Sequence, residues 1–318
     1  MRMDNEADRQ DLERKLIFVK LYVCIDIGGT SIKYGLAAAD GNFAAKDSMP
    51  TEVREKGAQI LPGKIQGIVD GYRKEGYVLA GIAISTAGMV DPEEGCILYA
   101  GDTFPGYTGM KLREIVEKSI GLPCTVENDV NAAGLGEFWL GAGRGAHSIF
   151  CLTVGTGIGG CVILDGKLVH GAGNCAGEIG YMELGGPENF QQTAATSRLV
   201  QKVAALKGLA ASEVDGRKVF TWAQQGDVTA GQAIDEMLAC LAKGIANICY
   251  VLNPEVLILG GGIMEQEDYL RPRLLAVLKQ NMVPKVFTST RFAFAEHKND
   301  AGMLGALYHF LQCRELNK

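Results

Sequence analysis

Short apolar runs bounded by glycine or polar residues alternate along the chain with longer segments of helical apolar spacing. The short runs predict strands: three within 16–46, then 78–85, 124–127, 148–154, 161–164, 167–170, 256–259 and 291–295. The longer segments predict helices, at about 57–75, 108–120, 130–139, 194–207, 229–250, 268–280 and 300–313. This alternation predicts an α/β protein.

One pattern of strand, glycine turn, strand, Asp-Gly and strand occurs twice. Its first copy turns at Gly28-Gly29-Thr30 and again at Asp40-Gly41, and its second at residues 155–160 and again at Asp165-Gly166. Asp-Gly between apolar runs is typical of a tight hairpin. An internal repeat of this kind predicts two similar α/β halves with equivalent glycine turns.

The glycine turns are candidate phosphate sites. Residues 155–160 match G-x-G-x-x-G, but that dinucleotide fingerprint needs a helix directly after it, and here a strand is predicted. A P-loop motif is absent from the sequence. The remaining phosphate-binding possibility is a glycine hairpin with backbone N–H groups and a hydroxyl, and the alternative is an ordinary hairpin turn.

Both turns satisfy that description. The expected phosphate ligands are Gly28, Gly29, Thr30, Gly155, Thr156 and Gly157. Asp26, at the end of the first strand, would lie near a nucleotide-bound metal, and Lys33 follows shortly after the first turn.

Composition limits the other possibilities. With 47% hydrophobic and 21% charged residues the chain is globular, and its net charge of −6 gives no support to nucleic-acid binding. Its apolar runs are too short for a bilayer span, and its charged N-terminus is not a secretory signal. The nine cysteines include no C-x-x-C pair and are expected to be reduced. These features predict a cytoplasmic protein with no membrane or nucleic-acid partner.

Four segments in order resemble the ROK family (repressors, open reading frames and kinases) over about residues 20–315. They are 26–33 (DIGGTSIK), 127–133 (ENDVNAA), 152–160 (LTVGTGIGG) and 171–180 (GAGNCAGEIG). The resemblance implies an actin-like ATPase (ribonuclease H-like) α/β fold, with two similar domains and a central cleft. We expect a polar extension at 1–17, one domain at 18–136 plus 300–318, and the other at 137–299.

The resemblance also implies a sugar kinase that uses ATP and Mg²⁺. Asp129 would be the general base for the 6-hydroxyl of the sugar, and Asn128 would bind an adjacent hydroxyl. The alternative for Asn128-Asp129 is the N-cap of the following helix, which is compatible with that function.

Other site residues come from the same resemblance. Glu178 would accept hydrogen bonds from two sugar hydroxyls, and Thr103 lies near a sugar-contacting position of relatives. The turn of Gly260, Gly261 and Gly262 would pack under the adenine, its alternative being the entry to a helix.

The chain departs from many relatives around residue 181. Tyr181 stands where they have a histidine, and no cysteine occurs between Cys175 and Cys240, so we expect no structural zinc. Residues 187–196 replace the zinc loop, and Gln191 or Gln192 falls near the glutamate of relatives. The identity of the sugar is therefore open.

The prediction is a kinase acting on the 6-hydroxyl of a hexose or hexoside, of glucose or β-glucoside type. Residues 180–182 and 297–306 resemble β-glucoside kinases, whereas 216–219 resembles some N-acetylmannosamine kinases, so the latter activity is an alternative. A sugar-responsive repressor is a remote alternative, because its DNA-binding domain would need more residues before the first strand. A non-catalytic sugar sensor or scaffold without such a domain is another, disfavoured because Asp129 and both glycine turns are present. A homodimer is expected from the family.

Overall fold

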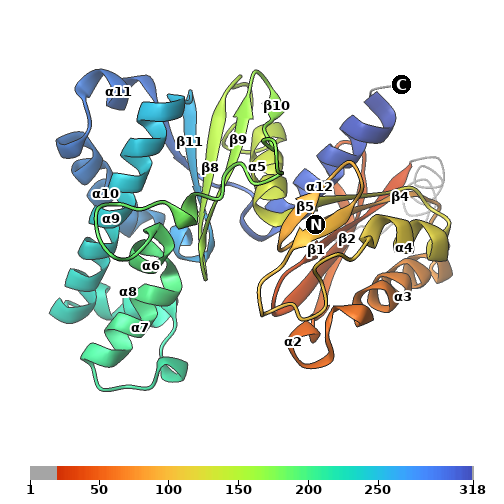
Figure 1. Cartoon of the computed structure of the whole chain (residues 1–318), viewed down its shortest axis with the longest axis horizontal. Helices are drawn as coiled ribbons and strands as arrows, with labels where there is room; N and C mark the ends of the chain where they lie inside the picture. Colours follow the sequence, from red (N-terminus) through yellow and green to blue (C-terminus); the bar gives the residue numbers. More distant parts are fainter. Residues whose placement is uncertain (1–19, 317–318) are drawn as a thin grey trace, which may run out of the picture. The chain divides into compact units, whose positions relative to one another are not determined.

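The computed structural model describes residues 20–316, and the predicted extension at 1–17 lies outside these residues. Two compact units are present (Figure 1). One ends at Gly136 and resumes at Asp300, and the other is Glu137–Asn299. Each is described by itself.

The first unit contains a five-stranded sheet of order β3-β2-β1-β4-β7 and a two-stranded hairpin, β5-β6. The strands are β1 (Leu21–Ile27), β2 (Ser31–Ala38), β3 (Phe43–Pro50), β4 (Leu79–Thr86), β5 (Met89–Asp91), β6 (Cys96–Tyr99) and β7 (Cys124–Asn128). The helices are α2 (Val53–Lys56), η1 (Ala58–Ile60), α3 (Leu61–Lys74), α4 (Leu112–Ile120), α12 (Ala301–Leu311) and η6 (Gln312–Leu316). The short helix η5 (Lys298–Asp300) begins in the second unit and ends here. Helix α5 (Asp129–Trp139) starts here and ends in the second unit.

The second unit contains a five-stranded sheet of order β10-β9-β8-β11-β12. Its strands are β8 (Ile149–Val154), β9 (Ile158–Leu164), β10 (Lys167–Leu168), β11 (Val256–Gly260) and β12 (Arg291–Phe294). Its helices are η2 (Ile179–Tyr181), α6 (Phe190–Ala194), α7 (Thr196–Leu206), η3 (Ala211–Glu213), α8 (Gly216–Gln224), α9 (Val228–Leu252), η4 (Gly262–Glu265), α10 (Glu267–Asn281) and α11 (Pro284–Ser289).

The two sheets share one topology, which confirms the predicted α/β class with two similar halves. In each, the first three strands pair antiparallel and the last two join in parallel. Asp165 and Gly166 both have positive φ, 50° and 74°, as a type I′ hairpin turn requires.

Helices cover the first sheet on both faces. Helices α3 and α4 share one apolar core with β1, β4 and β7, and α12 packs against the same strands. The Tyr22 ring lies 5.3 Å from the Phe310 ring of α12. Because β1 is covered twice, its sequence is an almost unbroken apolar run, as is typical of a strand within a covered sheet. Within residues 20–316, no helix is long and apolar enough to span a bilayer.

Several predicted elements differ in detail. The helix expected from 108 begins at Leu112, and the one expected at 194–207 is interrupted at Ala195, between α6 and α7. Residues 158–160 belong to β9 rather than to a turn. Gly160 stands there because a Cβ would lie 2.5 Å from the Phe150 ring, a constraint set by packing that the motif does not reveal. Sequence reasoning also missed α2, α8, α11 and the β5-β6 hairpin.

Replacing Gly305 with alanine is expected to destabilise the protein by about 2 kcal/mol or more. The new Cβ would clash with the backbone oxygen of Ala132, where α12 crosses α5. Gly67→Ala in α3 is the matched control, because its Cβ would meet no atom within 4 Å. That change should stabilise by about 0.5–1 kcal/mol. Urea unfolding measures both, and equal stability of the two variants would contradict the close helix crossing.

Candidate active site

Three parallel strand ends in the first unit bring polar side chains together. Ile27 of β1 is level with Thr86 of β4, and Thr86 is level with Asn128 of β7. In open α/β sheets, ligands bind at the carboxyl ends of the strands. The side chains of Asp26 and Ser85 therefore share this edge with Asn128.

Asp26 is held by hydrogen bonding and charge. Ser85 Oγ donates to Asp26 Oδ1 over 2.8 Å, and Lys33 Nζ lies 3.9 Å from Asp26 Oδ2. Burial raises the pKa of the Asp26 carboxyl above its usual value, while the Ser85 hydrogen bond and the Lys33 charge act in the opposite direction. A Cβ on Gly302 would lie 3.0 Å from the carboxylate, so glycine allows α12 to approach it closely.

The first glycine turn lies beside this carboxylate. The N–H of Gly28 donates to the Ser31 carbonyl over 3.0 Å, and Thr51 Oγ1 donates to the Gly28 carbonyl over 2.7 Å. These bonds fix the turn, while Gly29 and Thr30 at its tip are exposed. Exposed backbone at a fixed turn is accessible to a phosphate group.

Thr103 is exposed on the loop before α4. The next residue, Phe104, is buried, and its ring lies close to Gly29. The loop that carries Thr103 is therefore next to the first glycine turn, and the sugar contact of Thr103 itself stays a prediction.

Asn128 caps the helix that begins with Asp129. Its Oδ1 accepts from the backbone N–H groups of Val130 and Asn131 over 2.9 and 3.0 Å, as an N-cap does. Its Nδ2 donates to the Gly88 carbonyl and to Asp129 Oδ1 over 2.9 and 3.0 Å. The helix-cap alternative is thus confirmed, and the sugar-binding role of Asn128 stays a prediction.

Asp129 has a fixed orientation at this edge. Its Oδ1 accepts from Asn128 Nδ2 and also from the Val130 N–H over 2.9 Å. Burial raises the pKa of the nearby Tyr107 phenol, the Thr86 hydrogen bond lowers it, and the charge of Asp129 raises it further. The two groups are thus within electrostatic range of each other.

In the second unit, the glycine turn between β8 and β9 borders a cavity of about 520 Å³. Gly155 and Thr156 line it, together with Gly262 after β11. A volume of this size is in the usual range for a small-molecule site. Strand β9 follows the turn directly, so the absence of a dinucleotide fingerprint helix is confirmed.

The three glycines of the predicted adenine turn have different positions. Gly260 ends β11 and is buried, while Gly261 has a φ of 99° and packs against the backbone of Val154. Gly262 lines the cavity, and a Cβ there would meet nothing within 4 Å. Any side chain at 262 would therefore occupy open space.

Sequence reasoning missed the opposite wall of this cavity. It is formed by the first residues of α7 and α8: Thr196, Ser197, Gly216 and Arg217. Ser197 Oγ donates to the Thr156 carbonyl over 2.6 Å, which ties α7 to the glycine turn. Asp215 caps α8 by accepting from the Lys218 N–H over 2.8 Å. That capping pattern was the available signal for α8.

The loop that carries Glu178 packs on β9. Cβ atoms at Gly177 and Gly180 would clash with the backbone of Gly160 and Ile158, so glycine is required for this contact. Burial raises the pKa of the half-buried Glu178 carboxyl above its usual value. Tyr181, three residues on, is 57% exposed.

Gln191 joins this loop to the glycine turn. Its Oε1 would lie 2.8 Å from a Cβ on Gly157 and 3.1 Å from one on Gly180. The structure thus groups Gln191, Gly157 and the end of the Glu178 loop on one side of the second unit.

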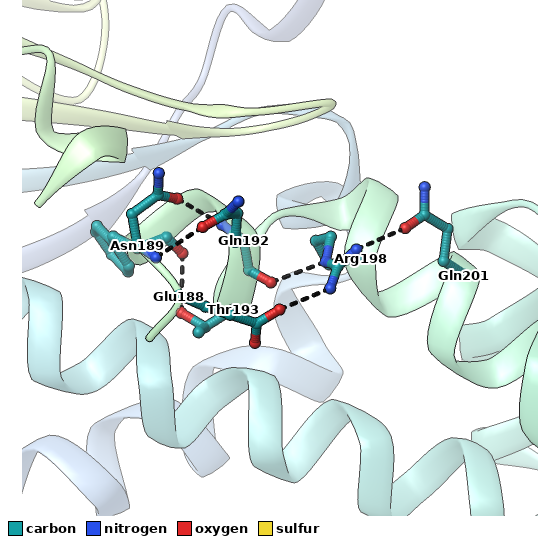
Figure 2. Close-up of polar contacts among 7 residues, drawn as sticks. Glu188, Asn189, Gln192, Thr193, Arg198 and Gln201 are labelled. Atoms are coloured by element: carbon teal, nitrogen blue, oxygen red, sulfur yellow. Dashed lines mark hydrogen bonds and ion pairs between the residues drawn. The ribbon is translucent and has the colours of Figure 1, made fainter. Parts of the chain in front are cut away.

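Glu188, Asn189, Gln192 and Thr193, within residues 187–196, form a polar network with Arg198 and Gln201 of α7, shown in Figure 2. Asn189 and Gln192 form a reciprocal capping box at α6, and Arg198 of α7 binds back to this segment. Within the described range 20–316, no cluster of three or more His, Cys, Asp or Glu side chains is placed to bind a metal ion.

The strand order and paired glycine turns define an actin-like nucleotide-binding fold, and comparisons with known proteins agree. The model of a family described as ROK matches residues 22–312. A β-glucoside kinase of Listeria monocytogenes is 35% identical over 294 residues, covering 90% of this chain and 96% of that relative.

Solved structures give the same result. A Listeria monocytogenes protein, provisionally assigned as an N-acetylmannosamine kinase, matches with a TM-score of 0.80 and 32% identity over 93% of this chain and 100% of its own. A ROK glucokinase of Streptomyces griseus, in complex with glucose and AMPPNP, matches with a TM-score of 0.75 and 26% identity over 91% and 98%. The chain belongs to the ROK family, and its predicted actin-like ATPase fold is confirmed.

Replacing Ser85 with alanine is expected to raise the pKa of Asp26 further. The change removes a hydrogen bond that favours the ionised carboxylate, so protonation should persist to higher pH. A ¹³C NMR titration of the Asp26 side-chain carboxyl measures this shift. Thr51→Ala is the control, because that hydroxyl binds Gly28 instead. An unchanged or lower pKa in Ser85→Ala would contradict the described contact.

Proposed function

We propose that the protein is a sugar kinase that transfers the γ-phosphoryl group of Mg-ATP to the 6-hydroxyl of a hexose or hexoside of glucose or β-glucoside type. The observation that carries this proposal is the oriented Asp129 carboxylate, at the same sheet edge as Asp26 and the first glycine turn. The similarity to a β-glucoside kinase and to a glucokinase supports the acceptor class.

The second unit supplies the nucleotide pocket in this proposal. The cavity of about 520 Å³ would take the nucleoside, with Gly262 on its wall. The Gly155-Thr156-Gly157 turn would bind phosphate through backbone N–H groups and a hydroxyl. Thr156 is exposed, and its carbonyl is held by Ser197, so its side chain is accessible on a fixed backbone.

The first unit supplies the base. Phosphoryl transfer needs little covalent chemistry from the protein, so positioning and charge account for most of the rate. Asp129 Oδ1 is occupied by the Asn128 amide and the Val130 N–H, which fix the carboxylate plane. The carboxylate would accept the proton of the 6-hydroxyl as its oxygen bonds to phosphorus and the ADP oxygen leaves.

Asp26 fits a magnesium ion that arrives with the nucleotide. Mg²⁺ is usually held by one or two carboxylates together with substrate phosphates. Asp26 offers such an oxygen, and Lys33 Nζ lies 3.9 Å from it. When bound, Mg²⁺ would neutralise charge on the phosphate oxygens. Ser85 keeps the carboxylate oriented.

Glu178 and Tyr181 would select the sugar. A partly buried carboxylate can accept hydrogen bonds from two neighbouring hydroxyls, and an exposed tyrosine ring can stack on a sugar or on a substituent at carbon 1. Because the provisionally assigned N-acetylmannosamine kinase is also similar, that sugar is the second candidate acceptor. The dimer, the cytoplasmic location and the lack of structural zinc remain predictions.

Asp129→Asn is expected to lower kcat by roughly 10²–10⁴-fold while leaving sugar and nucleotide affinity nearly unchanged. The amide keeps the shape of the side chain and cannot accept the proton. Mg-ATP-dependent ADP release, measured against a panel of sugars, tests this. Asp102→Asn is the matched control, an exposed carboxylate on the loop of Thr103, and should keep wild-type turnover. Near-wild-type kcat in Asp129→Asn would contradict the assigned base.

Gly262→Leu is expected to abolish the thermal stabilisation that Mg-ADP gives the wild-type protein. The leucine would project into the cavity, whereas the backbone at 262 needs no positive φ. Ligand-induced stabilisation scales with ligand concentration over Kd, so a blocked pocket removes it. Gly231→Leu in α9 is the control, since its Cβ also meets no atom within 4 Å and lies outside the cavity. A full shift in Gly262→Leu would place the nucleotide elsewhere.

A further inference from the structure

The segment of residues 187–196, which leads into α7, is anchored on its apolar side by Phe190, with Ala194 and Ala195 also buried. Phe190 is fully buried, and Gly244 of α9 makes room for its ring, since a Cβ there would clash with it. The Phe190 N–H donates to the Met182 carbonyl over 2.8 Å. This anchor fixes the apolar side of the segment. Its polar edge, the side that carries Glu188 and Gln192, is held by other contacts.

The polar edge is held by Arg198 (Figure 2). Its Nε donates to the Gln192 carbonyl over 2.9 Å, and its Nη2 to Glu188 Oε1 over 2.8 Å. Its Nη1 donates to Gln201 Oε1 over 3.0 Å, which fixes the guanidinium on α7. A planar guanidinium can make these bonds at once because its N–H groups point in fixed directions.

The segment spans a hollow at this point. A cavity of about 430 Å³ is lined by Glu188, Gln192 and Thr193 of the segment, by Arg198 and Lys202 of α7, and by Glu236 and Cys240 of α9. Close packing therefore does not support the polar edge from below. The Asn189–Gln192 capping box shapes this edge, and the hydrogen bonds from Arg198 tie it to α7.

Gln191 lies between the two anchors. Phe190 precedes it, and the carbonyl that Arg198 binds belongs to the residue after it. Its Oε1 is aimed at Gly157 of the glycine turn and at Gly180 of the Glu178 loop. A shift of the segment would therefore move Gln191 away from both.

We propose that Arg198 is a positioning residue for the acceptor, which holds Gln191 against the Glu178 loop by binding Glu188 and the Gln192 carbonyl. This inference rests on the proposed function. In this inference, an exposed arginine outside the predicted site keeps Gln191 and the Glu178 loop in place to bind the sugar.

The ion pair of Arg198 and Glu188 is exposed: 45% of the Arg198 side chain and 48% of the Glu188 side chain are accessible to solvent. Exposed ion pairs contribute little to global stability, so variants should fold with an almost unchanged Tm. Misplacing a segment that positions the substrate lowers the catalytic rate much more than it changes the free energy of unfolding. Kinetic constants can therefore separate this role from a merely structural one.

Arg198→Ala is expected to raise KM for the sugar roughly 3- to 10-fold, with KM for Mg-ATP and Tm close to wild type. Arg198→Lys should be intermediate, because an ammonium keeps the charge without the fork of donors. Glu188→Ala in the Arg198→Ala background should add almost nothing, since the two residues act as one unit. Lys202→Ala is the control. Lys202 is on α7, as Arg198 is, but its ion pair is with Glu236 of α9 and not with the segment.

A wild-type sugar KM in Arg198→Ala, or an equal rise in Lys202→Ala, would overturn the inference. If Arg198→Ala does not fold, Gln191→Ala gives the decisive measurement: the same rise in sugar KM supports the inference, and an unchanged KM overturns it. Absence of sugar-dependent ADP release from the wild-type protein would contradict the proposed function itself, and this inference with it. An active wild type with unaffected variants would contradict the inference alone.

Discussion

The candidate chemistry depends on the parallel pairing of β1, β4 and β7. Because Ile27, Thr86 and Asn128 are level across these strands, the chain presents Asp26, Ser85 and Asn128 at one sheet edge. A shift of one residue in any pairing would break this alignment of the strand ends. Asn128 then caps α5, and the same side chain orients Asp129, so one amide links the start of a helix to the proposed base. The burial of β1 by helices on both faces keeps this register fixed.

The second unit has the same strand order, but different groups surround its glycine turn. Its glycine turn follows β8 as the first turn follows β1, and the groups that share its cavity include the N-termini of α7 and α8. This arrangement leaves a cavity of about 520 Å³ beside Gly155, Thr156 and Gly262. The Glu178 loop packs on β9 through Gly177 and Gly180, and Gln191 of α6 joins it to the same turn. A single repeated topology therefore carries both glycine turns, while the Glu178 loop and residues 187–196, to which the proposal assigns sugar selectivity, lie outside the repeated strands.

Sequence patterns predicted what depends on local chemistry. Alternating apolar runs predicted the main strands of both halves and their repeated succession, and the Asp165-Gly166 turn has the positive φ values that its residues favour. Sequence patterns did not predict features that depend on contacts with residues far away in the sequence. Nothing local places Gly160 inside β9, because the reason is the Phe150 ring and the Gly177 carbonyl. The Arg198 network was missed for the same reason. Arg198 binds Glu188 and the Gln192 carbonyl, which lie six to ten residues before it, and these residues line a cavity that the sequence does not reveal.

The most direct test of the account is the position of the transferred phosphate. The wild-type protein would be incubated with Mg-ATP and, in parallel, with glucose, cellobiose, N-acetylmannosamine and 6-deoxyglucose, and the product followed by ADP release and ³¹P NMR. The account predicts ADP release with at least one sugar that has a 6-hydroxyl, a phosphorus signal coupled to the protons on carbon 6, and no product from 6-deoxyglucose. Phosphorylation of 6-deoxyglucose, or no sugar-dependent ADP release from protein that still binds the nucleotide, would contradict it.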